Sequence, residues 1–382
     1  MAPTLRPVRV AIDVGPLHGQ RTGIGQAVAG LVGALSASST SGESDSIAAR
    51  VTIMPYVTST RADREPSQRR LPIPAAAAIR LWSRNSAPTV DRWLGRPDLV
   101  HGTNYVVPPT RCPRLVSVYD CWFLEHPRDV DANVRRAAAV LRRSVADGAH
   151  VVTSSTSTTS RVRELLATDR VHTIHLGPPP VPTIPAEDRP MTLPDIDGGP
   201  FILALGTVER RKNIPTLVAA FGRLAREHES VRLVIAGAPG NDVAAVDRAL
   251  SRLDTAASRR VLRLGPVSDA EKTWLLANAR TLAYPSLDEG FGFPILEAQQ
   301  LGTPVVASTA GSIPEITGAA ALLSAPLDAE ALAANLYWVV NSDDMHAKLA
   351  RRGHANLRRF TWSDTADRLV DLYRSLIQEV DG

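Results

Sequence analysis

A stretch crowded with proline divides the chain into two halves, and this division constrains the fold more than any other feature. Eight prolines fall between Gly177 and Pro200, and two glycines stand next to the last of them. Proline lacks a backbone donor and fixes φ, so this stretch cannot form a long helix or a central strand. We interpret residues 178–199 as a linker stiffened by proline. The 382 residues then form two domains, which suits their number.

The first half, residues 1–177, alternates short apolar runs with segments of helical periodicity. Strands separated by helices need crossover connections, and this indicates parallel βαβ units. The predicted strands are residues 8–14, 51–56, 98–100, 115–119, 150–153 and 171–175, and the predicted helices are residues 26–35, 132–145 and 157–166.

The same alternation starts again after the linker and extends over residues 200–362. The predicted strands are residues 201–205, 231–235, 260–264, 281–284 and 304–307, and the predicted helices are residues 214–226, 243–253, 270–278, 294–301, 329–340 and 344–357. A last helix is predicted within residues 363–382. The fold class is therefore α/β, with two Rossmann-like, doubly wound domains, and ligands are expected in a cleft at their strand ends.

Composition and charge exclude several classes of protein. With 44% hydrophobic and 21% charged residues, the chain has the composition of a globular protein. A net charge of +4 and the lack of a nucleic-acid-reading motif argue against nucleic acid as a partner. Cys112 and Cys121 are too few for a disulfide framework or a metal cluster. There is no apolar signal core and no apolar stretch long enough to span a membrane, so we expect a cytoplasmic protein.

The segment 286–301, SLDEGFGFPILEAQQL, carries the strongest chemical signal. Glu289 and Glu297 are eight positions apart, and Pro294 is suited to the first turn of the helix that follows Gly292. The start of such a helix presents free N–H groups to an anion. Glu297, one turn inside, could accept hydrogen bonds from a vicinal diol such as a ribose. The alternative is that one glutamate favours the helix start and the other is solvated.

This segment resembles the Glu-x7-Glu motif of the retaining family-four glycosyltransferases, whose two-Rossmann-domain architecture is called GT-B. The likeness covers nearly the whole chain and is densest from residue 201 to residue 325. It includes GTVERRKN at 206–213, LGTPVVAS at 301–308, RTGIG at 21–25 and HGTNYVVPP at 101–109. The resemblance implies transfer of a hexose from a nucleotide diphosphate sugar to a glycan or lipid-linked acceptor, with retention of configuration. GDP-mannose is the donor favoured by family analogy, and a UDP-sugar is the alternative.

The resemblance also implies roles for individual residues of the second domain. Arg211 and Lys212 would bind the diphosphate and Glu297 the ribose. Glu289 would hold the hydroxyls of the donor sugar. The remaining donor contacts would come from Gly206 in the phosphate loop, from the backbone of Phe291 and Gly292, and from Val267 near the base.

The first domain supplies further candidates. Gly23 and Gly25 fall between a predicted strand and a predicted helix, where a phosphate or the acceptor could bind. Tyr119 and Asp120 occupy the place of the family's His-Asp pair at the donor sugar, so a tyrosine replaces the expected histidine. A tyrosine hydroxyl can donate to a sugar oxygen but does not titrate near neutrality. Either Tyr119 serves a different sugar geometry, or activity is weakened and the protein is a nucleotide-sugar-binding scaffold.

We expect no metal and no cofactor. A departing nucleoside diphosphate has a charge of about −3, and two cations with two helix N-termini supply about +3. The Asp-x-Asp triplets at 129–131 and 195–197 are not at strand ends that would face a nucleotide. An NAD enzyme fits poorly, because Val28 stands where the dinucleotide motif needs its third glycine. Another GT-B chemistry, such as nucleotide-sugar epimerisation, stays open.

The acceptor side is less defined. The helix predicted at 132–145 carries four arginines, which could rest on the anionic inner face of the cell membrane beside a lipid-linked acceptor. The alternative is a basic helix face exposed to solvent. The oligomeric state cannot be inferred from the sequence.

Overall fold

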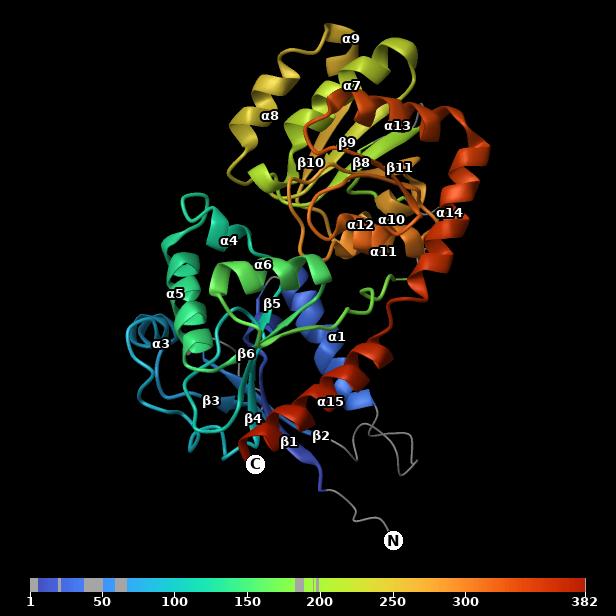
Figure 1. Cartoon of the computed structure of the whole chain (residues 1–382). Coiled ribbons are helices and arrows are strands. Elements are labelled where there is room, and N and C mark those ends of the chain that lie inside the picture. The colour runs from blue at the N-terminus through green and yellow to red at the C-terminus, as the bar shows by residue number, and fades with distance from the viewer. Residues whose placement is uncertain are drawn as a thin grey trace. The chain divides into compact units, whose positions relative to one another are not determined.

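The computed structural model describes residues 6–19, 22–37, 51–58, 67–182, 189–194, 196 and 199–381. The chain divides into two compact units (Figure 1). The N-terminal unit consists of Met1–Gly177 together with Phe360–Gly382, and the C-terminal unit is Pro178–Arg359. The predicted linker, residues 178–199, belongs to the second unit by this division, and part of it lies outside the described residues.

The N-terminal unit is built on a seven-stranded sheet in which every neighbouring pair is parallel. The strand order is β3-β2-β1-β4-β5-β6-β7. The strands are β1 Val8–Asp13, β2 Val51–Val57, β3 Arg69–Arg70, β4 Leu99–Gly102, β5 Arg114–Val118, β6 His150–Thr153 and β7 Val171–Thr173.

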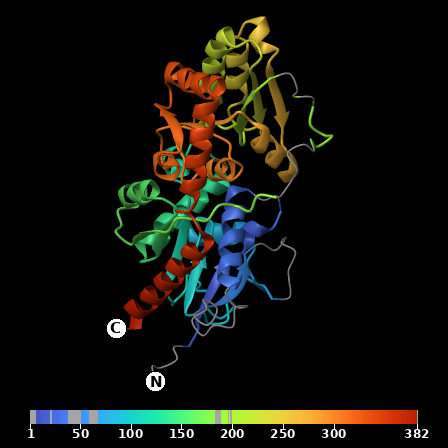
Figure 2. The same ribbon diagram turned by 90° about the vertical axis from the view of Figure 1, so that its right-hand side faces the viewer.

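Helices cover both faces of this sheet (Figure 2). On one face pack α3 Ala75–Trp82 and α5 Ala132–Ala146, and the unit also contains η1 Gly15–Leu17, α4 Trp122–Glu125 and α6 Thr156–Leu166. On the other face, α1 Gly23–Ala37 packs against the last helix, α15 Trp362–Asp381. The two are so close that a Cβ added to Gly30 would lie within 2.0 Å of the Trp362 ring. The C-terminal helix therefore completes the N-terminal unit.

The C-terminal unit has a six-stranded parallel sheet in the order β10-β9-β8-β11-β12-β13. Its strands are β8 Phe201–Leu205, β9 Arg232–Ala236, β10 Val261–Gly265, β11 Thr281–Tyr284, β12 Val305–Ser308 and β13 Ala321–Ser324. Its helices are η2 Arg210–Lys212, α7 Ile214–Glu227, α8 Val243–Leu250, α9 Thr255–Ser258, α10 Asp269–Asn278, α11 Phe293–Gln300, α12 Ile313–Thr317, α13 Ala329–Asn341 and α14 Asp343–Leu357. Figure 1 shows α7, α8 and α13 on one side of this sheet and α10, α11 and α12 on the other.

Strand order places a topological switch point in each unit. In the C-terminal unit the order reverses between β8 and β11, and in the N-terminal unit it reverses between β1 and β4. Parallel sheets bind ligands beyond the carboxyl ends of their strands at such points, because the loops there diverge. The loops after β8 and β11 contain residues 206–213 and 285–292, which include the predicted phosphate loop and the first half of the predicted glutamate motif.

The predicted α/β fold class with two Rossmann-like domains is confirmed. The sequence analysis did not predict β3, α3 or β13, nor the short helices α4, α9 and α12, and it placed the ends of some other elements wrongly. The helix predicted to reach residue 253 ends at Leu250, and the strand predicted to reach residue 175 ends at Thr173. None of the described helices is both long enough and apolar enough to cross a membrane.

Candidate functional site

Two loops at the switch point of the C-terminal unit are tied to each other by hydrogen bonds. The Leu287 amide donates to the Arg211 carbonyl at 2.7 Å, and the Asn213 side-chain amide donates to the Pro285 carbonyl at 2.9 Å. Asn213 lies between η2 and α7 in a left-handed backbone conformation, with φ of 53°. Asparagine adopts this conformation more readily than most residues do. The basic turn η2 is thereby fixed beside the loop that carries Glu289.

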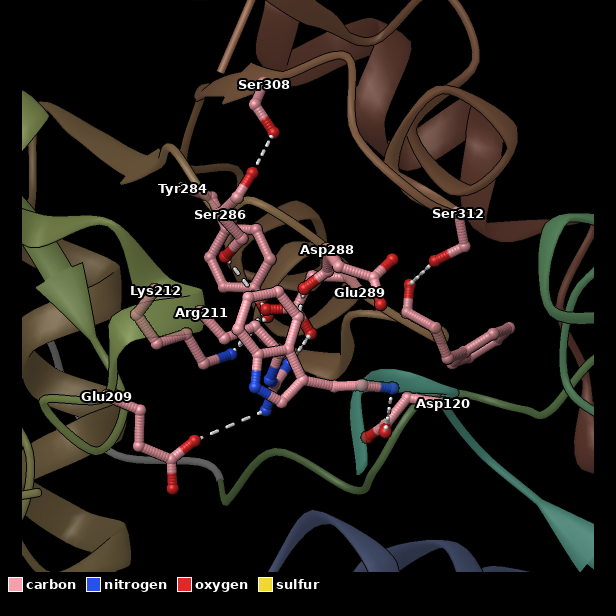
Figure 3. A network of polar contacts seen from close by, with 12 residues as sticks. Asp120, Glu209, Arg211, Lys212, Tyr284, Ser286, Asp288, Glu289, Ser308 and Ser312 are labelled. Atoms are coloured by element: carbon pink, nitrogen blue, oxygen red, sulfur yellow. Dashed lines mark hydrogen bonds and ion pairs between the residues drawn. The ribbon is translucent and has the colours of Figure 1, made fainter. Parts of the chain in front are cut away.

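Glu289 lies between the two basic side chains of η2 (Figure 3). Its Oε2 accepts from Arg211 Nη1 at 2.7 Å, and its Oε1 accepts from Lys212 Nζ at 2.6 Å and from Ser286 Oγ at 2.8 Å. We call Arg211, Lys212 and Glu289 the ion cluster. Three residues from two distant stretches of sequence thus form one partly buried, charge-assisted network.

Glu289 is only 6% exposed, yet its carboxylate is ionised. Burial alone would raise the pKa of Glu289, but the two neighbouring cations and the Ser286 hydroxyl outweigh it and lower the pKa to about 2. Burial lowers the pKa of Lys212, and Glu289 acts in the opposite direction. The ion cluster therefore has a formal charge of +1, with its two cations already sharing one carboxylate.

Tyr284 forms one wall of the ion cluster. Its hydroxyl accepts from Lys212 Nζ at 3.0 Å, and the ammonium lies 4.8 Å from the centroid of its ring. Burial, followed by the charge of Glu289, raises the pKa of Tyr284 well above its ordinary value. This tyrosine stays neutral and acts as a positioning group for the lysine.

The backbone around Glu289 is held from the neighbouring strand β12 and the loop that follows it. Ser308 Oγ donates to the Ser286 carbonyl at 2.6 Å. Ser312 donates twice, from its amide to the Glu289 carbonyl at 2.9 Å and from its hydroxyl to the Phe291 carbonyl at 3.3 Å. These contacts, shown in Figure 3, make the loop part of the rigid framework of the domain.

The second glutamate of the predicted motif has a different partner. Glu297, on α11, is 3% exposed, and its Oε1 accepts from Lys272 Nζ on α10 at 2.7 Å. Helix α11 begins at Phe293 after Gly292, whose φ of 96° is a conformation that glycine adopts without strain. The sequence did not single out Lys272. The signal was there, because the chain has only three lysines, at 212, 272 and 348, and two of them pair with the two glutamates of the motif.

The other predicted donor contacts are placed around this centre. Gly206 directly follows β8 with φ of 133°, and a Cβ there would lie 3.4 Å from Lys212 Cε. Phe291 is buried beside the loop backbone that Ser312 holds. Val267 is half-buried in the loop between β10 and α10, away from the hydrogen bonds of the ion cluster. Their roles stay predictions.

Comparison with known proteins assigns the chain to a family. Residues 192–355 match the family model described as "Glycosyl transferases group 1". The "O-antigen chain mannosyltransferase B" of Escherichia coli is 32% identical over 292 residues, which are 73% of this chain and 74% of that protein. The chain belongs to the group 1 glycosyltransferases. Members of this family transfer sugars, and the family implies a nucleotide-sugar donor and a glycan acceptor.

Other relatives of this glycosyltransferase match shorter stretches or share mainly the fold. The "MMP alpha-(1->4)-mannosyltransferase" of Mycolicibacterium hassiacum is 39% identical over 121 residues, 30% of this chain and 29% of that protein. The solved structure of sucrose-phosphate synthase from Thermosynechococcus elongatus aligns with a TM-score of 0.71 at 21% identity, over 97% of this chain and all of that one. The two Rossmann-like domains of the glycosyltransferase thus have the predicted GT-B fold.

The predicted residues of the N-terminal unit lie at its strand ends and helix starts. Asp120 follows β5, and its carboxylate accepts from the Trp122 amide at 3.2 Å and from the Tyr105 hydroxyl at 3.5 Å. Gly23 and Gly25 occupy the first turn of α1, while Arg21 lies outside the described residues.

The sequence suggested that the Tyr119 hydroxyl could donate to the sugar, but the structure places this hydroxyl in a different environment. The hydroxyl is buried, and within the described residues no well-formed hydrogen bond reaches it, although the neighbouring Ser117 side chain acts against burial on its pKa. The side chain lines a small pocket of the N-terminal unit together with Ser117, Thr153 and Thr365. Burial also raises the pKa of Tyr119. This placement gives no support to Tyr119 as a donor to the sugar, and its role stays a prediction.

The structure describes one of the two Asp-x-Asp triplets. Asp131 caps α5, with its carboxylate accepting from the Asn133 and Val134 amides at 2.7 and 3.0 Å. The triplet at 195–197 lies largely outside the described residues. Within the described part of the chain, no three His, Cys, Asp or Glu side chains are grouped so that they could hold a metal ion. Metal independence stays a prediction.

Proposed function

We propose that this glycosyltransferase moves a hexose, with mannose as the favoured sugar, from a nucleoside diphosphate donor to a glycan or lipid-linked acceptor, without a metal and with retention of configuration. The observation that carries the proposal is the convergence of Arg211 and Lys212 on one buried carboxylate at the switch point of the C-terminal domain. Two fixed cations at the end of a parallel sheet are suited to the diphosphate of the donor.

The choice of mannose rests on relatives. The Escherichia coli protein that matches most of this chain is named as a mannosyltransferase, and so is the Mycolicibacterium hassiacum protein. The name of the first also supports a growing polysaccharide as the acceptor class. A UDP-sugar remains the alternative donor to GDP-mannose.

The ion cluster suggests how leaving-group charge is met. Glu289 neutralises one of the two positive charges next to it. An incoming diphosphate would compete for the same N–H donors, since a guanidinium offers five and an ammonium three. Glu289 would then be free to accept hydrogen bonds from hydroxyls of the donor sugar, and Glu297 from the ribose. Preorganised cations stabilise a departing diphosphate without reorganisation during the reaction.

In the transfer step, the bond between the anomeric carbon and the diphosphate oxygen breaks, and a bond from the same carbon to the acceptor oxygen forms on the same face. The acceptor proton passes to the departing phosphate oxygen. The protein mainly positions the reactants and stabilises the charge that leaves. No protein nucleophile is needed in this scheme.

The proposal is tested with purified full-length chain incubated with GDP-mannose, UDP-glucose or UDP-N-acetylglucosamine and an oligosaccharide acceptor, with EDTA present. We expect release of nucleoside diphosphate from one donor only when acceptor is present, and a product whose anomeric configuration by NMR matches that of the donor. Glu289→Gln should abolish transfer, and the exposed control Glu229→Gln should leave it unchanged.

The same experiment separates the competing functions. Interconversion of the donor sugar without acceptor would indicate an epimerase. If the donor binds but no acceptor supports turnover, the protein is a nucleotide-sugar-binding scaffold. This is the alternative suggested by Tyr119 in place of the family histidine. Inversion of configuration, or a strict need for a divalent metal, would refute the mechanism while leaving the family assignment intact.

A further inference from the structure

A groove on the surface of the C-terminal unit gathers arginines that the ion cluster does not use. It lies between α7 and α8, which contact each other and run side by side in Figure 1. The groove encloses about 530 Å³, and its walls include Arg223 and Arg226 from α7 and Arg248 and Arg252 from α8 and the turn after it. No function assigned so far uses these side chains.

The four arginines bring like charges together on two adjoining segments. Arg223 and Arg226 are three positions apart on α7 and share one helix face, whereas Arg248 lies on α8 and Arg252 in the turn that follows it. Like charges on one helix face destabilise the helix. Repulsion between the four guanidinium groups would therefore be relieved if an anion bound in the groove.

Most of these guanidinium groups form no hydrogen bond or close ion pair with the described residues, although the charge of Arg248 acts against burial on the pKa of the nearby Asp242. Arg223 lies 3.9 Å from Glu330, and both side chains are exposed. Within the described residues, the side chains of Arg226, Arg248 and Arg252 form no hydrogen bond and no ion pair. Asp254 is the carboxylate that lines the groove. It caps α9, because its Oδ1 accepts from the Ala257 amide at 2.8 Å.

Small apolar residues also line the groove. Ala219, Gly222 and Ala245 line it, and their small side chains leave the space between the arginine walls open. A Cβ added to Gly222 would lie 2.6 Å from a methyl group of Leu253, so α7 already touches the chain after α8 at this point. A concave site with an apolar lining and a few convergent charged groups is the usual form of a pocket for a small organic ligand.

We propose that this groove is a second anion site, which binds a soluble phosphate ester or pyrophosphate with two or more negative charges. Guanidinium groups bind phosphate oxygens in a bidentate, planar geometry, and this makes arginine the preferred residue for such recognition. Four arginines line the groove, and the carboxylates near them are Asp254 in its wall and Glu330 and Asp242 beside it. This excess of positive charge favours a multiply charged ligand over a monoanion. The volume is within the range of pockets that hold nucleotide-sized molecules. The proposal does not depend on which donor the ion cluster binds.

The test is a calorimetric titration of the full-length chain with inorganic pyrophosphate at low salt. We expect two sites in the unmodified chain. R226Q/R248Q/R252Q should weaken one of them by roughly 10- to 100-fold, as expected for lost charge-assisted hydrogen bonds, and leave the other intact. Lys212→Gln should do the reverse. The control R84Q/R351Q/R358Q removes the same charge from exposed arginines outside the groove and should keep both sites.

Two results would overturn the proposal. The first is a single site that Lys212→Gln removes and the groove variant does not change. The second comes from sedimentation with phosphatidylglycerol vesicles. If the groove variant loses vesicle binding while its pyrophosphate titration equals that of the unmodified chain, the groove recognises a lipid headgroup and not a soluble phosphate. Should the triple variant fold poorly by circular dichroism, the single change Arg248→Gln supports the proposal if it weakens the groove site alone, and counts against it otherwise.

Discussion

Glu289→Gln is the perturbation that probes the ion cluster most directly. Glutamine keeps the shape of the side chain but removes the charge that Arg211 and Lys212 share at 2.7 and 2.6 Å. In the folded chain the pKa of Glu289 is lowered from the ordinary 4.5 to about 2. A shift of this size corresponds to about 3 kcal/mol of folding free energy at neutral pH. The variant also leaves two half-buried cations next to each other, with only Glu209, 3.7 Å from Arg211, as a counterion, and this acts in the same direction.

The pH dependence of this effect has a definite sign. Because the folded pKa is lower than the unfolded one, the stabilisation is fully present above the ordinary pKa of 4.5 and disappears as the pH falls towards 2. At pH 7 the C-terminal unit of Glu289→Gln should therefore melt roughly 6–12 °C below the unmodified chain. This difference in melting temperature should disappear as the pH is lowered.

Thermal melts followed by tryptophan emission measure this gap, and hydrogen–deuterium exchange of peptides covering β8 and β11 locates it in the correct unit. Glu229→Gln, at an exposed position, is the matched control and should melt with the unmodified chain. A Glu289→Gln melting temperature within 1 °C of the unmodified value at pH 7 would refute the reasoning. So would a gap that persists at the acid end.

Three further predictions concern single contacts. Ser286→Ala removes a hydroxyl that donates to the ion cluster at 2.8 Å and should cost about 1–3 kcal/mol in urea unfolding, with little change in secondary structure. Lys272→Met leaves the buried Glu297 without its partner and should cost about 3–5 kcal/mol by the same measurement, whereas the exposed control Lys348→Met should be neutral. Tyr373→Phe removes the hydroxyl that lies 2.7 Å from His101 Nδ1 inside the N-terminal unit and should cost about 1–3 kcal/mol; equal stability would show that this buried contact is not needed to dock α15.

Much of the fold could be predicted because the periodicity of apolar residues and the positions of proline and glycine agree with it. The strand β6 His150–Thr153 was predicted to the residue, and α1 and α7 were found from their apolar spacing. The short strand β3 Arg69–Arg70 was missed because two arginines give no strand pattern. Strand β13 Ala321–Ser324 was also missed, since it follows a short helix and a turn without a break in apolar character.

The site could be predicted in part for a different reason. The candidate residues were found from the resemblance of segment 286–301 to a family motif, but the tertiary fold decides which side chain pairs with which. The sequence assigned Glu289 to a sugar and Arg211 to phosphate, and the structure places the two in direct contact. The partner of Glu297 was missed because α10 and α11, although consecutive helices, are brought into contact only by tertiary packing. The buried hydroxyl of Tyr119 could not be foreseen either, because burial depends on neighbours that no local pattern names.

The central claim is that Arg211 and Lys212 bind the diphosphate of the donor without a metal ion. Calorimetric titration with GDP and UDP in the presence of EDTA tests it, with the unmodified chain compared with Lys212→Gln. We predict that one nucleotide binds despite the chelator and that the substitution weakens its binding by roughly 10- to 100-fold, as expected for the loss of charge-assisted hydrogen bonds. Binding that appears only with added Mg²⁺, or that is unchanged in Lys212→Gln, would contradict the claim.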